Sequence, residues 1–182
     1  NLRCLHCYAE AGSKTKNIPV ELPKEFWIST INQITQYGCK SLQITGGEPL
    51  IRKDCVDIID NIIHGDVLVE LYSNLTLFDI NKFKHLSEKL SIATTILGPN
   101  ASIHDSITGV RGSFDKTTRA ISQCANEGFR LRANMIIMKR NSDYVDQTRQ
   151  VIHSLGVKNF GTDYIRAVGR GSQTNGYYGF ER

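Results

Sequence analysis

The feature that most constrains the fold is a regular alternation of short apolar segments with longer amphipathic ones. The apolar segments are rich in β-branched residues and predict five strands, over 40–45, 67–72, 90–97, 130–138 and 158–166. Apolar residues at helical spacing predict five helices, over 24–37, 54–64 and 79–89, after Ser113 and after Asn141. No hairpin signal joins two strands directly, so the alternation predicts βαβ units, the α/β class and a parallel sheet.

Right-handed crossovers would curl such a sheet into an open or closed barrel. The chain opens with a cysteine-bearing loop, and a loop of this kind is expected to follow a strand, so we expect a further strand before Asn1. Two helix starts are predicted from capping residues: Ser113 for one helix, and Asn141 with Ser142 for the last helix.

Composition and charge exclude several classes of function. The 182 residues carry a net charge of only +4, with the basic residues scattered, so we expect neither a nucleic-acid partner nor an anionic membrane surface. No run of about 18 or more apolar residues occurs, which argues against a membrane span. Five cysteines, an odd number without framework-like spacing, favour a reducing compartment, and we predict a cytoplasmic location.

Two motifs carry the chemistry. Cys4 and Cys7 form a C-x-x-C motif, which alone fits half of a zinc site, a redox dithiol or part of an iron–sulfur loop. The second motif is a turn after the first predicted strand, Gly46-Gly47-Glu48-Pro49. Ligands of parallel α/β sheets collect at the carboxyl ends of strands, which is where this turn falls. A zinc site would need two further ligands at suitable spacing, and a redox dithiol leaves the glycine turn unexplained.

With one cysteine placed before Asn1, the first motif would become C-x3-C-x2-C. That loop, followed by a Gly-Gly-Glu-Pro turn, resembles the radical S-adenosylmethionine (SAM) superfamily. The resemblance implies a TIM-like partial (β/α)6 barrel of parallel strands whose first strand is largely missing from the chain. Residues 1–168 would form the core and residues 169–182 a linker toward a C-terminal extension.

The resemblance also implies two cofactors. Three thiolates would hold three irons of a [4Fe-4S] cluster, and the amino and carboxylate groups of SAM would bind the fourth. An electron from a donor such as flavodoxin or ferredoxin would cleave SAM into methionine and a 5′-deoxyadenosyl radical, which abstracts a substrate hydrogen.

Site residues follow from the resemblance position by position. Cys4 and Cys7 match the second and third cluster ligands, His6 falls where the family packs a side chain near the adenine, and Tyr8 matches an aromatic residue after the last cysteine. The turn would meet the methionyl amino group, largely through backbone carbonyls, with Glu48 helping to fix it. These four positions are Gly46, Gly47, Glu48 and Pro49, and glycine lets the backbone come close.

Three strand positions complete the set. Ser73 and Asn74 resemble a polar pair at the end of a barrel strand, and Thr95 precedes a loop in which Leu97 replaces the aspartate that relatives often carry. Arg132 lies on the polar face of its predicted strand. It would either pair with the cofactor carboxylate or a substrate acid, or lie exposed at an edge.

The segment around Ile103-His104-Asp105 and the segment 166–171 further resemble enzymes with a cysteine-rich extension of the SPASM type, many of which modify ribosomal peptides. A peptide is therefore the implied substrate. Two alternatives stay open: a barrel used as a binding or regulatory module with a vestigial cluster loop, and a zinc-binding, non-redox protein. Three further cysteines are predicted to be structural, as small buried hydrophobes: Cys39, Cys55 and Cys124.

Overall fold

The computed structural model describes residues 1–11 and 20–174 and contains one parallel sheet. The strands pair in sequence order: β1 (Ser41–Ile44), β2 (Leu68–Tyr72), β3 (Leu90–Thr95), β4 (Arg130–Ile137) and β5 (Asn159–Tyr164). All four pairings are parallel, as the absence of hairpin signals predicts. The α/β class is confirmed, and the curved sheet is consistent with part of a TIM-like barrel.

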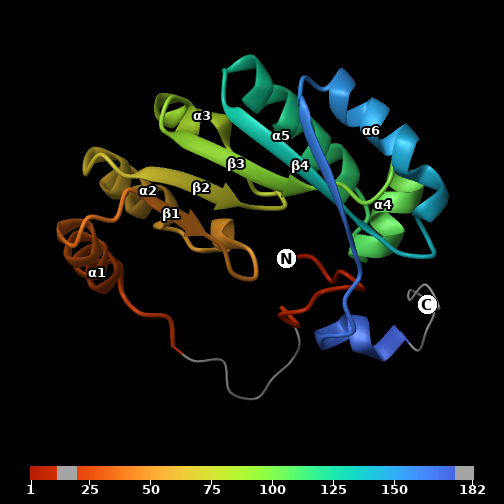
Figure 1. Cartoon of the computed structure of the whole chain (residues 1–182), viewed down its shortest axis with the longest axis horizontal. Helices are drawn as coiled ribbons and strands as arrows, with labels where there is room; N and C mark the ends of the chain where they lie inside the picture. Colours follow the sequence, from red (N-terminus) through yellow and green to blue (C-terminus); the bar gives the residue numbers. More distant parts are fainter. Residues whose placement is uncertain (12–19, 175–182) are drawn as a thin grey trace.

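Helices connect the strands and cover one face of the sheet (Figure 1). They are α1 (Lys24–Gln36), α2 (Cys55–His64), α3 (Ile80–Phe83), α5 (Ser113–Asn126) and α6 (Val145–Ser154), with a further helix, α4 (Ala101–Thr108), beside the carboxyl ends of the strands. Four 3₁₀ turns add η1 (Pro49–Ile51), η2 (Lys84–Leu86), η3 (Ser142–Tyr144) and η4 (Gly169–Thr174). Within 1–11 and 20–174, no helix has the length and apolar character needed to cross a membrane.

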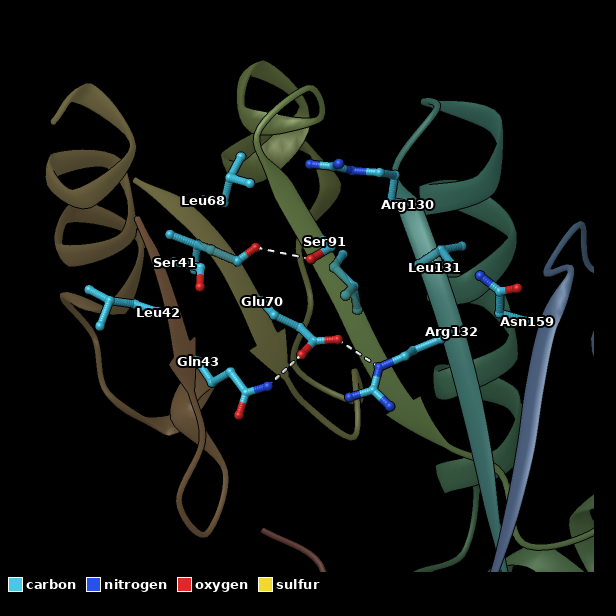
Figure 2. Close-up of a pocket in the computed structure, with 12 residues that line it drawn as sticks. Ser41, Leu42, Gln43, Leu68, Glu70, Ser91, Arg130, Leu131, Arg132 and Asn159 are labelled. Carbon is cyan, nitrogen blue, oxygen red and sulfur yellow. Dashed lines mark hydrogen bonds and ion pairs between the residues drawn. The ribbon is translucent and has the colours of Figure 1, made fainter. Parts of the chain in front are cut away.

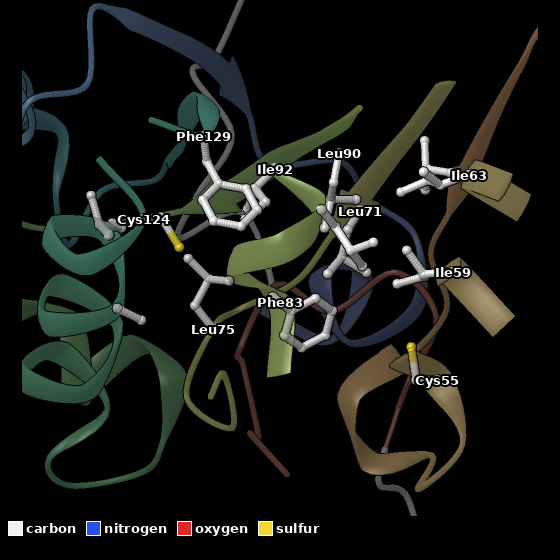
Figure 3. Close-up of a cluster of buried hydrophobic side chains, with 14 of the residues drawn as sticks. Cys55, Ile59, Ile63, Leu71, Leu75, Phe83, Leu90, Ile92, Cys124 and Phe129 are labelled. Atoms are coloured by element: carbon white, nitrogen blue, oxygen red, sulfur yellow. The ribbon is translucent and has the colours of Figure 1, made fainter. Parts of the chain in front are cut away.

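The helix-covered face of the sheet forms the hydrophobic core (Figure 3). Leu71 of β2 lies beside Ile92 of β3, and both are fully buried. Burial of each such side chain away from water contributes about 1.5–3 kcal/mol to the free energy of folding. Cys55 and Cys124 are also buried in this core, where burial raises their thiol pKa values to about 11 and about 12. Both stay neutral and act as apolar residues, in line with a structural role.

Helix α4 is the main element that sequence periodicity misses. It is short, and only three of its eight residues, Ala101, Ile103 and Ile107, are apolar. Two local signals mark its ends: Asn100 at the N-cap accepts a hydrogen bond from the Ile103 amide, and Gly109 adopts a left-handed conformation (φ +69°) after the last turn.

Both predicted capping assignments are wrong. Gly112, not Ser113, occupies the N-cap of α5, and the Asp105 carboxylate of α4 accepts hydrogen bonds from the Gly112 and Phe114 amides and the Ser113 hydroxyl. Asn141 precedes η3, where its side chain makes no capping bond. The side-chain nitrogen of Asn141 instead donates to the Leu97 and Ile136 carbonyls, and these bonds connect the end of β3 to the end of β4.

Candidate functional site

The cysteine loop, residues 1–11, has no regular secondary structure. Cys4 and Cys7 are half-buried, and the Cys7 amide donates to the Cys4 carbonyl (N···O 3.3 Å). The Ala11 amide donates to the Cys7 sulfur (3.3 Å). Burial, together with the neighbouring Cys7 charge, raises the thiol pKa of Cys4 to about 11. A thiolate pair at this position therefore requires a cation.

The Gly-Gly-Glu-Pro turn is organised by the Glu48 carboxylate, which is buried (9% exposed). It accepts hydrogen bonds from the Ser73 hydroxyl (2.7 Å), the Asn74 amide (2.8 Å) and the Leu50 amide (3.1 Å). Burial raises the pKa of Glu48 above its usual range, although these three donors oppose the shift. Glu48 thus joins the turn after β1 to the end of β2.

The structure brings the two motifs together. A Cβ atom on Gly47 would lie 3.1 Å from the Cβ of Ala11, so the turn packs against the end of the cysteine loop. At the start of that loop, the Asn1 side chain accepts a hydrogen bond from the Asn74 amide group (3.0 Å). Gly46 has a φ of +154°, which side-chain-bearing residues rarely adopt. Both ends of the loop therefore contact residues that follow β1 and β2.

His6 and Tyr8 lie in different environments. His6 is half-buried, its Nδ1 has no hydrogen-bond partner among the described residues, and burial with the nearby Arg170 charge lowers its pKa to about 4. Its imidazole is therefore neutral at pH 7. The Tyr8 side chain is 67% exposed.

Thr95 ends β3 on the face of the sheet opposite the helices, in register with Asn134 of β4. Leu97, the departure from the family pattern, is buried in a small second core with Ile107 and Met138. At the position where relatives often carry an aspartate, this chain thus has a leucine that makes an apolar contact between the end of β3 and α4. The structure gives Leu97 no polar role.

Arg132 projects from β4 over the same open face and meets side chains of β2 (Figure 2). Its Nε donates to the Glu70 carboxylate (2.6 Å), and a second nitrogen donates to the Tyr72 hydroxyl. Gln43 of β1 donates to the other oxygen of Glu70 (2.9 Å). Of this network, Gln43, Glu70 and Arg132 line a cavity of about 370 Å³, together with Ser91 and Arg130. Arg132 is therefore not a lone arginine at an edge.

Three residues with specific contacts were not among the predicted site residues. Asp105 caps α5, and His104 accepts the Leu97 amide at Nδ1 (3.2 Å), which leaves the proton on a buried Nε2 with no partner among the described residues. Arg170 contacts the cysteine loop from η4. All three lie in the two segments that resemble SPASM-type enzymes, but the partner of Arg170 lies 166 residues away in the chain.

A sequence model of the Radical SAM superfamily matches residues 1–152. The chain belongs to the radical SAM superfamily. The membership predicted from the two motifs is therefore confirmed, and the cofactors of the family are the predicted [4Fe-4S] cluster and SAM.

Two curated relatives illustrate the range of radical SAM proteins that resemble the chain. The antilisterial bacteriocin subtilosin biosynthesis protein AlbA of Bacillus subtilis (strain 168) is 26% identical over 175 residues, which cover 94% of this chain and 38% of AlbA. The AdoMet-dependent heme synthase of Methanosarcina barkeri is 28% identical over 180 residues, 96% of this chain and 50% of that protein. The chain spans half or less of the length of these relatives.

Among solved structures, SuiB of Streptococcus suis bound to its precursor peptide SuiA superposes with a TM-score of 0.77 at 15% identity. The match covers 92% of this chain and 37% of SuiB. A second SuiB structure has SAM bound and gives a TM-score of 0.74. At this level of identity the likeness shows a shared radical SAM fold.

The described residues fit part of the ligand set of a radical SAM cluster. Cys4 and Cys7 provide two sulfurs whose mutual repulsion and burial a cationic iron would relieve. The third thiolate stays a prediction, because the expected cysteine would precede Asn1. No group of three or more potential ligands from His, Cys, Asp and Glu occurs within 1–11 and 20–174.

Proposed function

We propose that the protein containing this chain is a radical SAM enzyme that acts on a ribosomal peptide. The carrying observation is the convergence of the cysteine loop and the Gly-Gly-Glu-Pro turn, which are joined at Gly47–Ala11 and at Asn1–Asn74. When bound at these strand ends, the cluster and SAM would supply a 5′-deoxyadenosyl radical for hydrogen abstraction. The residues of the cysteine loop and of the Gly-Gly-Glu-Pro turn would hold these cofactors.

The contacts separate residues that would touch SAM from residues that fix the backbone of the turn. Gly46 and Gly47 are exposed, so their backbone carbonyls are accessible to the methionyl amino group. The Glu48 carboxylate and the Ser73 hydroxyl bond to each other and therefore act by fixing that backbone. Pro49 begins the 3₁₀ turn that closes this loop.

The other predicted site residues would contact the cofactor or the substrate directly. A neutral His6 would pack near the adenine, and Tyr8 is the aromatic residue after the last cluster cysteine. Asn74 and Thr95 would contact SAM at the ends of β2 and β3. Arg132 would bind a carboxylate of SAM or of the substrate only by exchanging its bond to Glu70.

The peptide substrate is supported by AlbA, a bacteriocin biosynthesis protein, and by SuiB, which binds a precursor peptide. The heme synthase relative gives the competing assignment, a tetrapyrrole. We also infer a cytoplasmic location, because all five cysteines are free thiols. Reductive cleavage of SAM would require an electron donor such as flavodoxin or ferredoxin.

Anaerobic reconstitution of the full-length protein with iron and sulfide tests the cofactors. After reduction with dithionite, we expect a [4Fe-4S]+ electron paramagnetic resonance (EPR) signal that changes when SAM is added, and formation of 5′-deoxyadenosine. Cys7→Ala should abolish both, whereas Cys39→Ala, outside the loop, should retain both. Purified protein that binds zinc and no iron would overturn the proposal in favour of a non-redox metal site.

The substrate is tested separately with the reconstituted enzyme. A precursor peptide deuterated at its modified residues should transfer deuterium to 5′-deoxyadenosine, and an iron porphyrin precursor should not. Transfer from the porphyrin precursor alone would keep the radical SAM activity but reject a peptide substrate.

A further inference from the structure

The shape of the cysteine loop depends on two segments distant in sequence. On one side, the Arg3 and Leu5 amides donate to the Thr108 and Ile107 carbonyls at the end of α4, at 2.8 Å and 3.0 Å. On the other side lie Gly169 and Arg170, at the start of η4. Figure 1 shows this segment beside the N-terminal loop, near the carboxyl ends of the strands.

Arg170 makes three hydrogen bonds to carbonyl groups of the loop. Its backbone amide donates to Cys7 (3.0 Å), its Nε to Cys4 (2.8 Å) and one terminal nitrogen to Ala11 (2.9 Å). These three carbonyls bracket both cysteines and the segment that follows them. The rigid fork of a guanidinium can satisfy the Cys4 and Ala11 carbonyls together, which a lysine ammonium cannot do in the same geometry.

Gly169 allows this approach. Its φ is +59°, and a Cβ atom there would lie 2.6 Å from the Cys7 carbonyl oxygen and closer still to that of Tyr8. Any other residue would push η4 away from the loop. Gly169 therefore allows η4 to come close to the cysteine loop, and Arg170 makes the hydrogen bonds to it.

The Arg170 charge also lies beside the cysteines. Its guanidinium donates to the Cys4 and Ala11 carbonyls, on either side of Cys7. This positive charge would stabilise negative charge on sulfurs that bind iron. A cationic group beside an iron–sulfur cluster likewise stabilises its reduced, more negative state.

We propose that Arg170 is a positioning residue for the cluster: its bonds to Cys4, Cys7 and Ala11 hold the loop in its ligating shape and place a positive charge beside it. The inference rests on the proposed function for its cluster, but the contacts with the loop hold in the metal-free protein. It also gives residues 169–174 a part in the core, whereas the predicted linker was to begin at 169.

The experiment compares Arg170→Gln, Arg170→Lys and the control Arg166→Gln in the full-length protein. Arg166 is an exposed arginine of the same segment whose guanidinium bonds Asp163. In metal-free protein we expect alkylation of Cys4 and Cys7 to be about tenfold faster in Arg170→Lys, which keeps the positive charge beside the thiols but loses the hydrogen bonds of the guanidinium fork. Arg166→Gln should match the wild type.

In reconstituted protein, iron release to a chelator should also be about tenfold faster in both Arg170 variants, for the same reason. The midpoint potential of the cluster should fall in Arg170→Gln and stay near the wild-type value in Arg170→Lys, which keeps the charge. A general structural defect would not separate the two variants in this way.

Wild-type rates of alkylation and iron release in Arg170→Lys would overturn the inference. If the wild-type protein forms no cluster, the proposed function fails, while the alkylation rates still decide whether Arg170 holds the loop. If Arg170→Gln does not fold, Arg170→Lys alone decides, since slow, wild-type-like alkylation in that variant would reject the role of the guanidinium fork.

Discussion

Two glutamates on neighbouring strands of the sheet show opposite uses of a carboxylate. Glu48, after β1, is buried at the carboxyl edge of the sheet and accepts hydrogen bonds from one hydroxyl and two backbone amides. Glu70, within β2, lies on the open face with a side chain 22% exposed, and accepts hydrogen bonds from Arg132 and Gln43. Burial dominates at Glu48 and raises its pKa. Burial also raises the pKa of Glu70, but the bonds and charge of Arg132, with Tyr72 and Gln43, outweigh it.

The difference separates a structural support from an adaptable surface. The donors to Glu48 belong to the backbone and to a buried serine, so this carboxylate has one arrangement and fixes the turn that would meet SAM. The partners of Glu70 are flexible side chains lining a cavity, and they can exchange partners when a ligand enters (Figure 2). Four measurements of unfolding free energy test this distinction.

The largest effect is expected for Glu48→Ala. It leaves the Ser73 hydroxyl and the Asn74 and Leu50 amides without their acceptor, and we expect a loss of about 4 kcal/mol in unfolding free energy. Urea denaturation followed by the fluorescence of Trp27, the only tryptophan, measures it. Glu88→Ala, at an exposed position, should cost less than about 0.5 kcal/mol. A similar small loss for Glu48→Ala would mean that the turn holds itself without the carboxylate.

The second measurement extends the burial argument to His104, another buried polar side chain near the strand ends (1% exposed). Burial lowers its pKa from 6.5 to about 4. The unfolded state therefore binds the proton first, so this contribution is present above pH 6.5 and is lost as the pH falls toward 4. Between pH 7 and pH 4 we expect His104 to account for a loss of about 3 kcal/mol.

The variant His104→Asn, which keeps an acceptor for the Leu97 amide, should show a correspondingly weaker pH dependence. His64→Asn, at an exposed position (side chain 73% exposed), serves as the control and should leave the pH profile unchanged. Identical pH profiles for His104→Asn and the wild type would show that His104 can be protonated in the folded protein.

The third measurement concerns Asp105, which is only partly buried but bonds backbone amides, as Glu48 does. Removing this cap with Asp105→Ala should cost about 2 kcal/mol, the upper range for a helix N-cap. The matched control, Asp115→Ala, removes an exposed carboxylate from the first turn of the same helix and should cost less than about 1 kcal/mol. Equal losses would assign the effect to the helix dipole rather than to the hydrogen bonds.

Local pattern was sufficient to predict the sheet but not the contacts that build the site. The β-branched segments predicted all five strands and their parallel direction, because strand burial depends on the segment itself. Helix α4 was missed because its apolar residues are few and its capping signals stand in a segment read as loop. Ser113 was wrongly assigned as a cap because the capping carboxylate comes from the preceding helix.

The motif residues could be named from sequence, whereas their partners could not. Cys4, Cys7 and the turn at Gly46–Pro49 are local patterns, and the structure brings them together as the strand order requires. Arg170 and the loop it contacts are at opposite ends of the chain, and nothing near Arg170 in the sequence identifies the Cys4 carbonyl as its partner. Likewise, the sequence left open whether Arg132 pairs with a ligand acid or lies exposed at an edge, and its pairing with Glu70 depends on the register across β3.

The smallest effect is expected for that Glu70–Arg132 pair, where a double-mutant cycle with Glu70→Gln and Arg132→Gln isolates the interaction. Both side chains are partly exposed, at 22% and 36%, so solvent screens the charges and Gln43 and Tyr72 can replace either lost partner. We expect a coupling free energy of about 1 kcal/mol or less, reduced further by salt. A coupling as large as the loss for Glu48→Ala would make this network a second rigid support, and Arg132 would then not be free to bind a ligand carboxylate.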